Sequence, residues 1–228
     1  MIYIGFGKNS SYKMQTQKEL KDLRLYLITE RSLFEGQKSF LFAVEAALMG
    51  GVKALQLREK DLSDSDFIKL GIQLRILTSN YKAKLIINSR AEIAEKIGAD
   101  GVHLTETRLP ANEVKSSFPG LIVGVSTHSL EGAHLAEKEG ADYITFSPIY
   151  KTPSKANCGP PQGLNLLRKV TQAVRLPVLA LGGITLHRVP ECLKQGAFGV
   201  ALISDIWDSS HIKDHSFEYT QNFGGNTL

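Results

Sequence analysis

Short apolar runs recur along the chain, and most of the stretches between them carry apolar residues at helical spacing. The runs are rich in β-branched residues, which is typical of strands that are buried on both faces. Eight such runs predict eight strands, at Leu25–Thr29, Ala54–Arg58, Lys84–Asn88, Gly101–Leu104, Leu121–Ser126, Tyr143–Ser147, Pro177–Gly182 and Gly199–Ser204.

Helix signals occupy the intervals between these runs. Apolar residues at helical spacing over 41–48 are followed by Gly50-Gly51, a pair that favours helix termination. Ser63 and Asp66 have the spacing of a capping box, so we expect the next helix to begin there. The predicted core-facing stripe of that helix consists of Phe67, Leu70, Leu74 and Leu77.

Alternating strands and helices predict a parallel sheet with helices packed outside it. Eight strands are the number that closes a (β/α)8 TIM barrel, and 228 residues are enough for one such domain. An open doubly wound sheet is the competing architecture, but no GxGxxG follows the first predicted strand. We therefore predict a single-domain α/β barrel over residues 24–207, with irregular extensions at 1–23 and 208–228 that resemble decorations or frayed ends.

Composition and charge argue against several function classes. Hydrophobic residues make up 43% and charged residues 22%, the balance of an ordinary globular protein. The formal net charge is only +4, and no basic cluster is interleaved with aromatics, so we expect no nucleic-acid partner. No apolar run approaches the roughly 18 residues of a membrane span, and the N-terminus lacks the features of a signal peptide. These observations predict a cytoplasmic protein without a membrane partner.

The second predicted strand ends in hydrogen-bond donors. In a barrel the active site lies where the strands end, and strand alternation places Gln56 and Arg58 on one face. Lys60 follows on the same side, so the three side chains form a donor set suited to phosphate or pyrophosphate. The alternative is that Arg58 and Lys60 merely pair with the neighbouring acids Glu59 and Asp61.

Two further polar segments fall at predicted strand ends. The loop after the sixth strand holds Thr152, Ser154 and Lys155, which form either an anion clamp or an ordinary polar surface loop. Gly182-Gly183 ends the seventh strand and Ile203-Ser204 the eighth, where many barrels bind phosphate through backbone N–H groups.

Nine motifs along the chain carry a family resemblance. They are LYLIT at 25–29, QLREK at 56–60, IN at 87–88, GADGVHL at 98–104, GVSTHS at 124–129, GADY at 140–143, PIY at 148–150, GL at 163–164 and GGI at 182–184. In this order and spacing they resemble the thiamin phosphate synthase/TenI family, from about Leu25 to Ile206.

The resemblance implies substrates and binding residues. Synthases of this family join a hydroxymethylpyrimidine pyrophosphate to a thiazole phosphate and release pyrophosphate. By resemblance, the residues that would hold the pyrophosphate are Arg58, Lys60 and Asn88, with Ser126, Thr152, Ser154 and Lys155 completing the clamp. Those that would hold the thiazole phosphate are Gly183, Ile203 and Ser204.

The chain departs from the family pattern at the magnesium site. The synthases use two aspartates there, and the matching positions in this chain are Ser89 and Arg108. These residues shift the local formal charge by about +3, so we expect no metal and no other cofactor. If the protein is nevertheless a synthase, Glu106 or Asp61 would supply a ligand, or Arg108 would itself neutralise the pyrophosphate.

The missing acids favour the TenI-like branch of the family, whose known chemistry is thiazole tautomerisation. This proton transfer needs a group that titrates near neutral pH and no metal. His128 is the candidate acid/base, although synthases often carry the same Thr-His pair. His103 is the rival candidate, but a histidine within a strand of this family is more often structural.

The sequence therefore predicts a thiazole tautomerase, an isomerase of thiamin biosynthesis. The alternative is a thiamin phosphate synthase, a transferase, with an altered magnesium site, and a second alternative is a non-catalytic ligand-binding or regulatory module. The expected partners are a phosphorylated thiazole and, in the alternatives, a pyrimidine pyrophosphate or thiamin phosphate. A homodimer is compatible with a barrel of this size.

Overall fold

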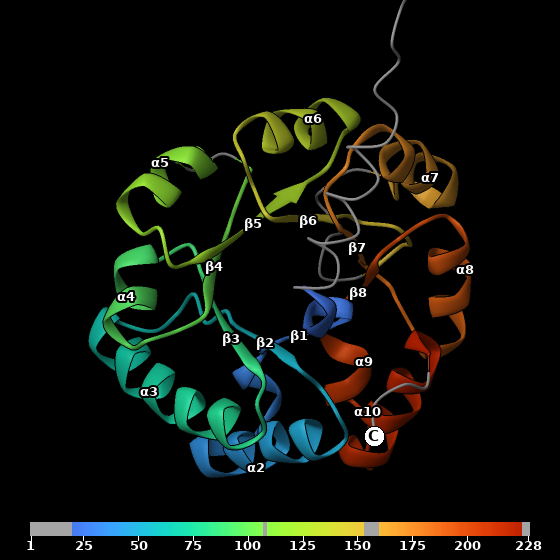
Figure 1. Ribbon diagram of the computed structural model, residues 1–228. Coiled ribbons are helices and arrows are strands. Elements are labelled where there is room, and N and C mark those ends of the chain that lie inside the picture. The colour runs from blue at the N-terminus through green and yellow to red at the C-terminus, as the bar shows by residue number, and fades with distance from the viewer. Residues whose placement is uncertain (1–19, 107–108, 153–159, 225–228) are drawn as a thin grey trace, which may run out of the picture.

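The computed structural model describes residues 20–106, 109–152 and 160–224. Eight parallel strands close into one barrel in which each strand pairs with the next and β8 pairs with β1 (Figure 1). The predicted (β/α)8 barrel is confirmed. The strands are β1 (Leu25–Ile28), β2 (Ala54–Leu57), β3 (Lys84–Asn88), β4 (Gly101–Leu104), β5 (Ile122–Thr127), β6 (Tyr143–Phe146), β7 (Val178–Leu181) and β8 (Gly199–Leu202).

Helices form a ring outside the strands (Figure 1). The α-helices are α2 (Gly36–Met49), α3 (Asp64–Asn80), α4 (Ala91–Lys96), α5 (Ala111–Ser117), α6 (Leu130–Lys138), α7 (Gly163–Ala173), α8 (Val189–Lys194), α9 (Ser204–Trp207) and α10 (Ile212–Thr220). Short 3-10 helices are η1 (Lys21–Arg24), η2 (Arg31–Leu33), η4 (Leu186–Arg188) and η5 (Gln221–Phe223). The predicted cap of α3 is present, since the Ser63 side chain accepts a hydrogen bond from the backbone N–H of Asp66. Within the described residues, no helix has both the length and the apolar composition needed to cross a membrane.

Strand alternation divides the core into two layers. Leu55 and Leu57 of β2 belong to the large cluster between the strands and the helices. Gln56, between them, is 1% exposed and faces the interior, where a smaller cluster includes Tyr26 and Ile86. The predicted orientation of β2 is therefore confirmed, and it directs polar side chains toward the barrel interior and its rim.

The N-terminal extension was predicted as decoration up to residue 23, and this is wrong for its last residues. Leu20 and Leu23 are buried, and both pack against the interior cluster of the barrel. η1 contacts β8 and β2 just before β1 begins, so it covers the barrel at the amino ends of the strands. The preceding residues of that extension, 1–19, lie outside the described part of the chain.

The C-terminal extension was predicted to be irregular, a decoration or a frayed end, yet its residues 212–220 form α10, which packs against α2. Ser216 and Tyr219 are fully buried in this contact. The contact requires a glycine at the end of α2, because a Cβ atom on Gly50 would lie 2.3 Å from the Lys213 carbonyl oxygen. α10 is short and carries few apolar residues, which explains why its packing leaves only a weak signal in the sequence.

We expect Gly50→Ala to lower the free energy of unfolding by about 1–3 kcal/mol, because the added methyl group would overpack the contact between α2 and α10. Gly120→Ala is the matched control, since a Cβ atom there would meet nothing within 4 Å. Denaturant unfolding of both variants measures the difference. Equal stability of the two variants would show that α10 does not dock as described.

Candidate active site

A pocket of about 550 Å³ opens at the carboxyl ends of β2 and β3. It is lined by Glu59, Lys60, Phe67, Asn88, Ser89, Arg90 and Thr105. Two of the predicted site residues, Lys60 and Asn88, therefore share one cavity. Carboxyl ends of strands are where barrel enzymes place their reacting groups.

A chain of amide and hydroxyl groups fixes the orientation of Asn88 in this pocket. The Gln56 side chain donates from Nε2 to Asn88 Oδ1 over 3.0 Å. Asn88 in turn donates from Nδ2 to the Ser89 hydroxyl over 3.2 Å. A buried amide must be paired to avoid a desolvation penalty, so the position of Gln56 sets that of Asn88. Gln56 thus lies behind Asn88 and not on the open surface of the pocket.

Ser89 adopts a left-handed backbone conformation, with φ of 61°. This region is unfavourable for a residue with a Cβ atom and is found mainly where the surrounding structure enforces it. The enforcing contact is on the backbone, because the Ser89 N–H donates to the His103 carbonyl oxygen over 2.9 Å. Ser89 therefore presents its side chain to the pocket from a strained turn directly after Asn88.

The cations at the end of β2 do not pair with their acidic neighbours. Asp61 forms its ion pair with Arg31, and Glu59 accepts a hydrogen bond from the Arg31 backbone N–H over 3.0 Å. Arg58 and Lys60 form no ion pair with any other residue in the described ranges. The alternative in which these two cations pair with Glu59 or Asp61 is therefore wrong, and their positive charge remains available to an anion.

Glu59 is the one carboxylate that lines the pocket, and it is buried. Burial raises the pKa of this carboxyl group, against the lowering effect of hydrogen bonds from Thr29 and from the Arg31 backbone. Both hydrogen bonds come from the segment that follows β1, so the carboxylate points toward that side of the rim. The pocket is also lined by two cationic residues, Lys60 and Arg90. Together with the single carboxylate of Glu59, they give the lining residues a net positive formal charge.

The described residues do not fit a magnesium ion held by two carboxylates. Ser89 offers only a hydroxyl, and Asp61 is engaged by Arg31. Glu106 lies against the first turn of α6, where its Oε1 would be 2.0 Å from a Cβ atom on Gly132. No group of three or more His, Cys, Asp or Glu residues with metal-binding geometry occurs in the described part of the chain. Arg108, the other position of interest, lies outside the described residues.

Arg90 is a pocket residue that the sequence analysis missed. Its guanidinium lies 4.1 Å from the centroid of the Phe67 ring, and Nη2 donates to the Leu62 carbonyl oxygen over 3.3 Å. Nη1 is 3.6 Å from Asp64, which holds the group at the edge of the pocket. Arg90 follows Asn88 by two residues at the end of the same strand, and this spacing is the feature of the sequence that could have identified Arg90 as a site residue.

Ser126 belongs to a second group of polar side chains, inside the barrel. The Ser126 hydroxyl lies 3.0 Å from Nε2 of His103, and Nδ1 of His103 lies 3.2 Å from the Tyr143 hydroxyl. Tyr143 also bonds to the Tyr26 hydroxyl over 2.9 Å, and burial raises the pKa of both tyrosines. Both nitrogens of His103 are therefore engaged, as in a structural histidine, and the chain of contacts fixes the Ser126 side chain.

His128 follows β5 and is half-buried. Its Nδ1 lies 2.8 Å from the Ser147 carbonyl oxygen, which can only accept a hydrogen bond. Nδ1 therefore carries the proton in the neutral ring, and Nε2 is the basic nitrogen. Nε2 bonds to no other residue in the described ranges, so this arrangement leaves it free to exchange a proton.

Close packing brings the loops after β6 and β7 together. The Tyr150 N–H donates to the Gly182 carbonyl oxygen over 3.0 Å. Gly183 has φ of 63°, and a Cβ atom there would lie 2.8 Å from the Lys151 carbonyl oxygen, so the approach requires glycine. Thr152 follows in the same loop. The predicted clamp residues Ser154 and Lys155 lie outside the described residues.

Ile203 and Ser204 lie where β8 passes into α9. Ile203 packs against the interior cluster, and Ser204 is exposed. α9 is held in place from two sides. Trp207 Nε1 donates to the Ile28 carbonyl oxygen over 2.8 Å. From α10, His215 bonds to Asp205 over 2.9 Å and Tyr219 bonds to it over 2.5 Å.

A family model described as thiamine monophosphate synthase matches residues 25–206. A protein of Aquifex aeolicus (strain VF5) that bears the name "Putative thiamine-phosphate synthase 2" is 50% identical over 181 residues, which cover 79% of this chain and 96% of that protein. The thiamine-phosphate synthase of Roseiflexus castenholzii (strain DSM 13941 / HLO8) is 41% identical over 80% of each chain. The solved thiamine phosphate pyrophosphorylase from Pyrococcus furiosus has a TM-score of 0.80 at 35% identity and covers 89% of this chain and 96% of its own.

These three relatives carry synthase or pyrophosphorylase names. Their names support the synthase alternative better than the tautomerase interpretation that the missing acids favoured, and they do not distinguish the TenI-like branch. The family resemblance itself is confirmed, since the matched segment spans the barrel from β1 to α9. The chain belongs to the thiamin phosphate synthase/TenI family of thiamin biosynthesis.

Proposed function

We propose that this protein is a thiamin phosphate synthase, a transferase that couples hydroxymethylpyrimidine pyrophosphate to a thiazole phosphate. The observation that carries the proposal is the charge of the pocket at the ends of β2 and β3. Lys60 and Arg90 line it beside Asn88, and its single carboxylate, Glu59, is turned toward the backbone of Arg31. Such a pocket suits a pyrophosphate group.

In the proposed reaction the bond between the pyrimidine methylene group and pyrophosphate breaks, and a bond to the thiazole forms. Negative charge then develops on the leaving pyrophosphate. Arg58, Lys60 and Arg90 would stabilise it electrostatically. Arg90 is held by Phe67 and by the Leu62 carbonyl oxygen, so its charge needs no reorganisation as the pyrophosphate leaves. Asn88, oriented by Gln56, would donate a hydrogen bond to the same group.

The thiazole phosphate would bind at the ends of β7 and β8. Gly183 supports this assignment because glycine has no Cβ atom to shield its backbone N–H from an anion, and its positive φ favours glycine at this position. Ser204 would add a hydroxyl donor, and Ile203 an apolar contact from the interior cluster. Ser126 and Thr152 would instead belong to the pyrophosphate clamp, as the family resemblance implies.

Because the described residues do not fit a magnesium ion, we assign no step of the coupling to a metal. The cations of the rim would take over the neutralisation of the pyrophosphate. No other cofactor enters the proposal.

Thiazole tautomerisation is the second candidate, and one specific observation favours it. His128 holds its proton on Nδ1 against the Ser147 carbonyl oxygen, so Nε2 is set to accept a proton from a bound thiazole. The synthase proposal gives His128 no such role. The two candidates therefore differ in what they predict for a His128 variant.

We expect the purified protein to form thiamin phosphate and release pyrophosphate when it is supplied with both synthase substrates. Chromatography of the products measures this directly. If no coupling occurs but the thiazole carboxylate phosphate is aromatised, the synthase proposal fails and the tautomerase is supported. Binding of thiamin phosphate with neither reaction would instead indicate a non-catalytic ligand-binding module.

Ser89→Asp should tighten Mn²⁺ binding by roughly tenfold or more, because it adds a carboxylate beside Asn88 where the wild type has none. Aspartate tolerates the left-handed conformation of this position. Titration followed by electron paramagnetic resonance compares the variant with the wild type. Equally tight Mn²⁺ binding by the wild type would show that the chain assembles a metal site from other ligands.

Lys60→Ala should raise the KM for the pyrimidine pyrophosphate by roughly 5- to 20-fold, the effect of losing one charge-assisted hydrogen bond at a half-open site. Lys69→Ala is the control, since Lys69 is an exposed lysine on α3 that pairs with Asp66 outside the pocket. Steady-state kinetics of both variants give the comparison. An unchanged KM in Lys60→Ala would remove this residue from the site.

His128→Asn distinguishes the two candidate reactions. Coupling should stay within about tenfold of the wild-type rate, because the proposed synthase chemistry uses no proton transfer at His128. A tautomerase would instead lose about 10²- to 10⁴-fold, the usual contribution of a general acid/base. Rates of both reactions in the wild type and the variant decide between them.

A further inference from the structure

Exposed large hydrophobic side chains are concentrated on one side of the barrel. Eight such residues occur in the described part of the chain, and six of them lie on η2, α2, α3 and α10. These six are Leu33, Phe42, Met49, Ile72, Ile76 and Phe217. α2 contacts each of the other three elements, and α2, α3 and α10 are neighbours in the ring of helices (Figure 1). A concentration of this kind typically marks an interaction surface.

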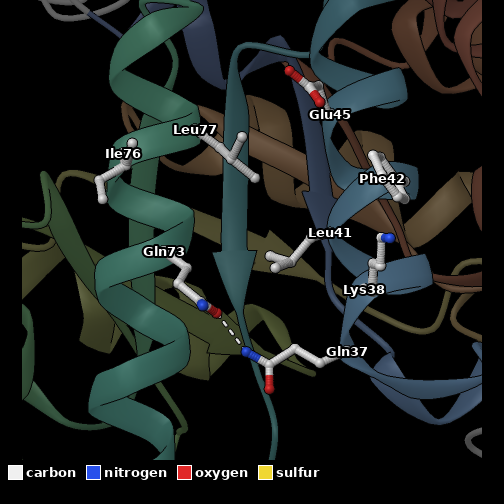
Figure 2. Close-up of a pocket in the computed structure, with 8 residues that line it drawn as sticks. All are labelled: Gln37, Lys38, Leu41, Phe42, Glu45, Gln73, Ile76 and Leu77. Atoms are coloured by element: carbon white, nitrogen blue, oxygen red, sulfur yellow. Dashed lines mark hydrogen bonds between the residues drawn. The ribbon is translucent and has the colours of Figure 1, made fainter.

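A groove of about 510 Å³ runs between α2 and α3 on this side. Figure 2 shows Leu41 of α2 and Leu77 of α3 pointing toward the space between the helices. Gln37 and Gln73 are hydrogen-bonded to each other across one end of the groove. The floor is therefore apolar and one end is closed by a polar pair, which leaves room for an apolar side chain from another molecule.

The same surface also carries an apolar projection that could fill such a groove. Phe42 lies next to Leu41 on α2 and is 60% exposed. A surface that bears both a projection and a hollow can pair with itself about a two-fold axis, as isologous interfaces do. This feature favours a second copy of the chain over an unrelated partner.

Charges on α2 favour the same occupant. Lys38 and Glu45 lie two turns apart on the helix, on either side of Leu41 and Phe42. If two α2 helices pack antiparallel about an axis between residues 41 and 42, position 38 of one copy faces position 45 of the other. Lys38 would then pair with the partner's Glu45, and Glu45 with the partner's Lys38. The Tyr81 hydroxyl donates to Glu45 over 3.1 Å and holds the carboxylate at the edge of the groove.

We propose that the surface formed by α2 and α3 is the interface of a homodimer, in which Phe42 of each copy enters the groove of the other. The interface lies on the outer wall of the barrel. It leaves the pocket at the ends of β2 and β3 open, and it is independent of the reaction that the protein catalyses.

Sedimentation equilibrium of the full chain at micromolar concentrations tests the proposal. The wild type should be a dimer and Phe42→Glu a monomer. Leu135→Glu is the matched control, because Leu135 is 50% exposed on the helix α6, far along the ring from α2, and this variant should stay dimeric. Both positions are exposed, so circular dichroism should report unchanged folding.

Charge-reversal variants test whether Lys38 of one copy pairs with the partner's Glu45. Lys38→Glu and Glu45→Lys should each raise the dimer dissociation constant at least tenfold, because each places like charges opposite one another. The combined variant should recover most of the wild-type affinity, since both pairs then form with reversed polarity.

Three results would overturn the proposal. A monomeric wild type would mean that the groove serves another protein or residues 1–19 of this chain. A dimer that persists in Phe42→Glu would place the interface elsewhere. Failure of the combined charge reversal to recover affinity would rule out the antiparallel arrangement of the two α2 helices.

Discussion

Hydrogen bonding between β1 and β8 closes the sheet, and the candidate site depends on that closure. Eight parallel strands in one barrel bring their carboxyl ends to a single rim, so residues far apart in sequence meet there. Asn88 at the end of β3 reaches Gln56 of β2, and Ser126 of β5 reaches His103 of β4. On the outside of the barrel, α10 docks on α2, and this contact supports the closure between β1 and β8.

The rim has an uneven distribution of charge. At the end of β2, Arg31 engages Asp61 and the backbone of Arg31 engages Glu59, so the nearby acids are satisfied by η2 and not by the cations of the pocket. Lys60 lines the pocket and forms no ion pair within the described residues. Ser89 stands in a strained conformation directly after Asn88, at a position where the family resemblance predicts an aspartate. These features are the basis for our proposal that the site binds phosphate groups through protein cations.

Local patterns predicted the parts of this molecule that local interactions determine. The eight strands, the cap at Ser63 and the inward face of Gln56 follow from periodicity and short-range hydrogen bonding. The backbone of Ser89 does not, because the His103 carbonyl that enforces it comes from a neighbouring strand. The same holds for the Tyr26–Tyr143 contact, which spans the barrel, and for α10, whose buried face is too small to leave a periodic signal. For the reaction, the missing acids favoured a tautomerase, whereas the named relatives support a synthase.

We propose, above all, that the cations at the ends of β2 and β3 bind pyrophosphate without a metal held by the protein. Isothermal titration calorimetry of inorganic pyrophosphate into the protein in the presence of EDTA tests this claim most directly. We expect saturable binding in EDTA that weakens in Lys60→Ala and is unchanged in Lys69→Ala. Binding that appears only when Mg²⁺ is added, and that ignores Lys60, would contradict it.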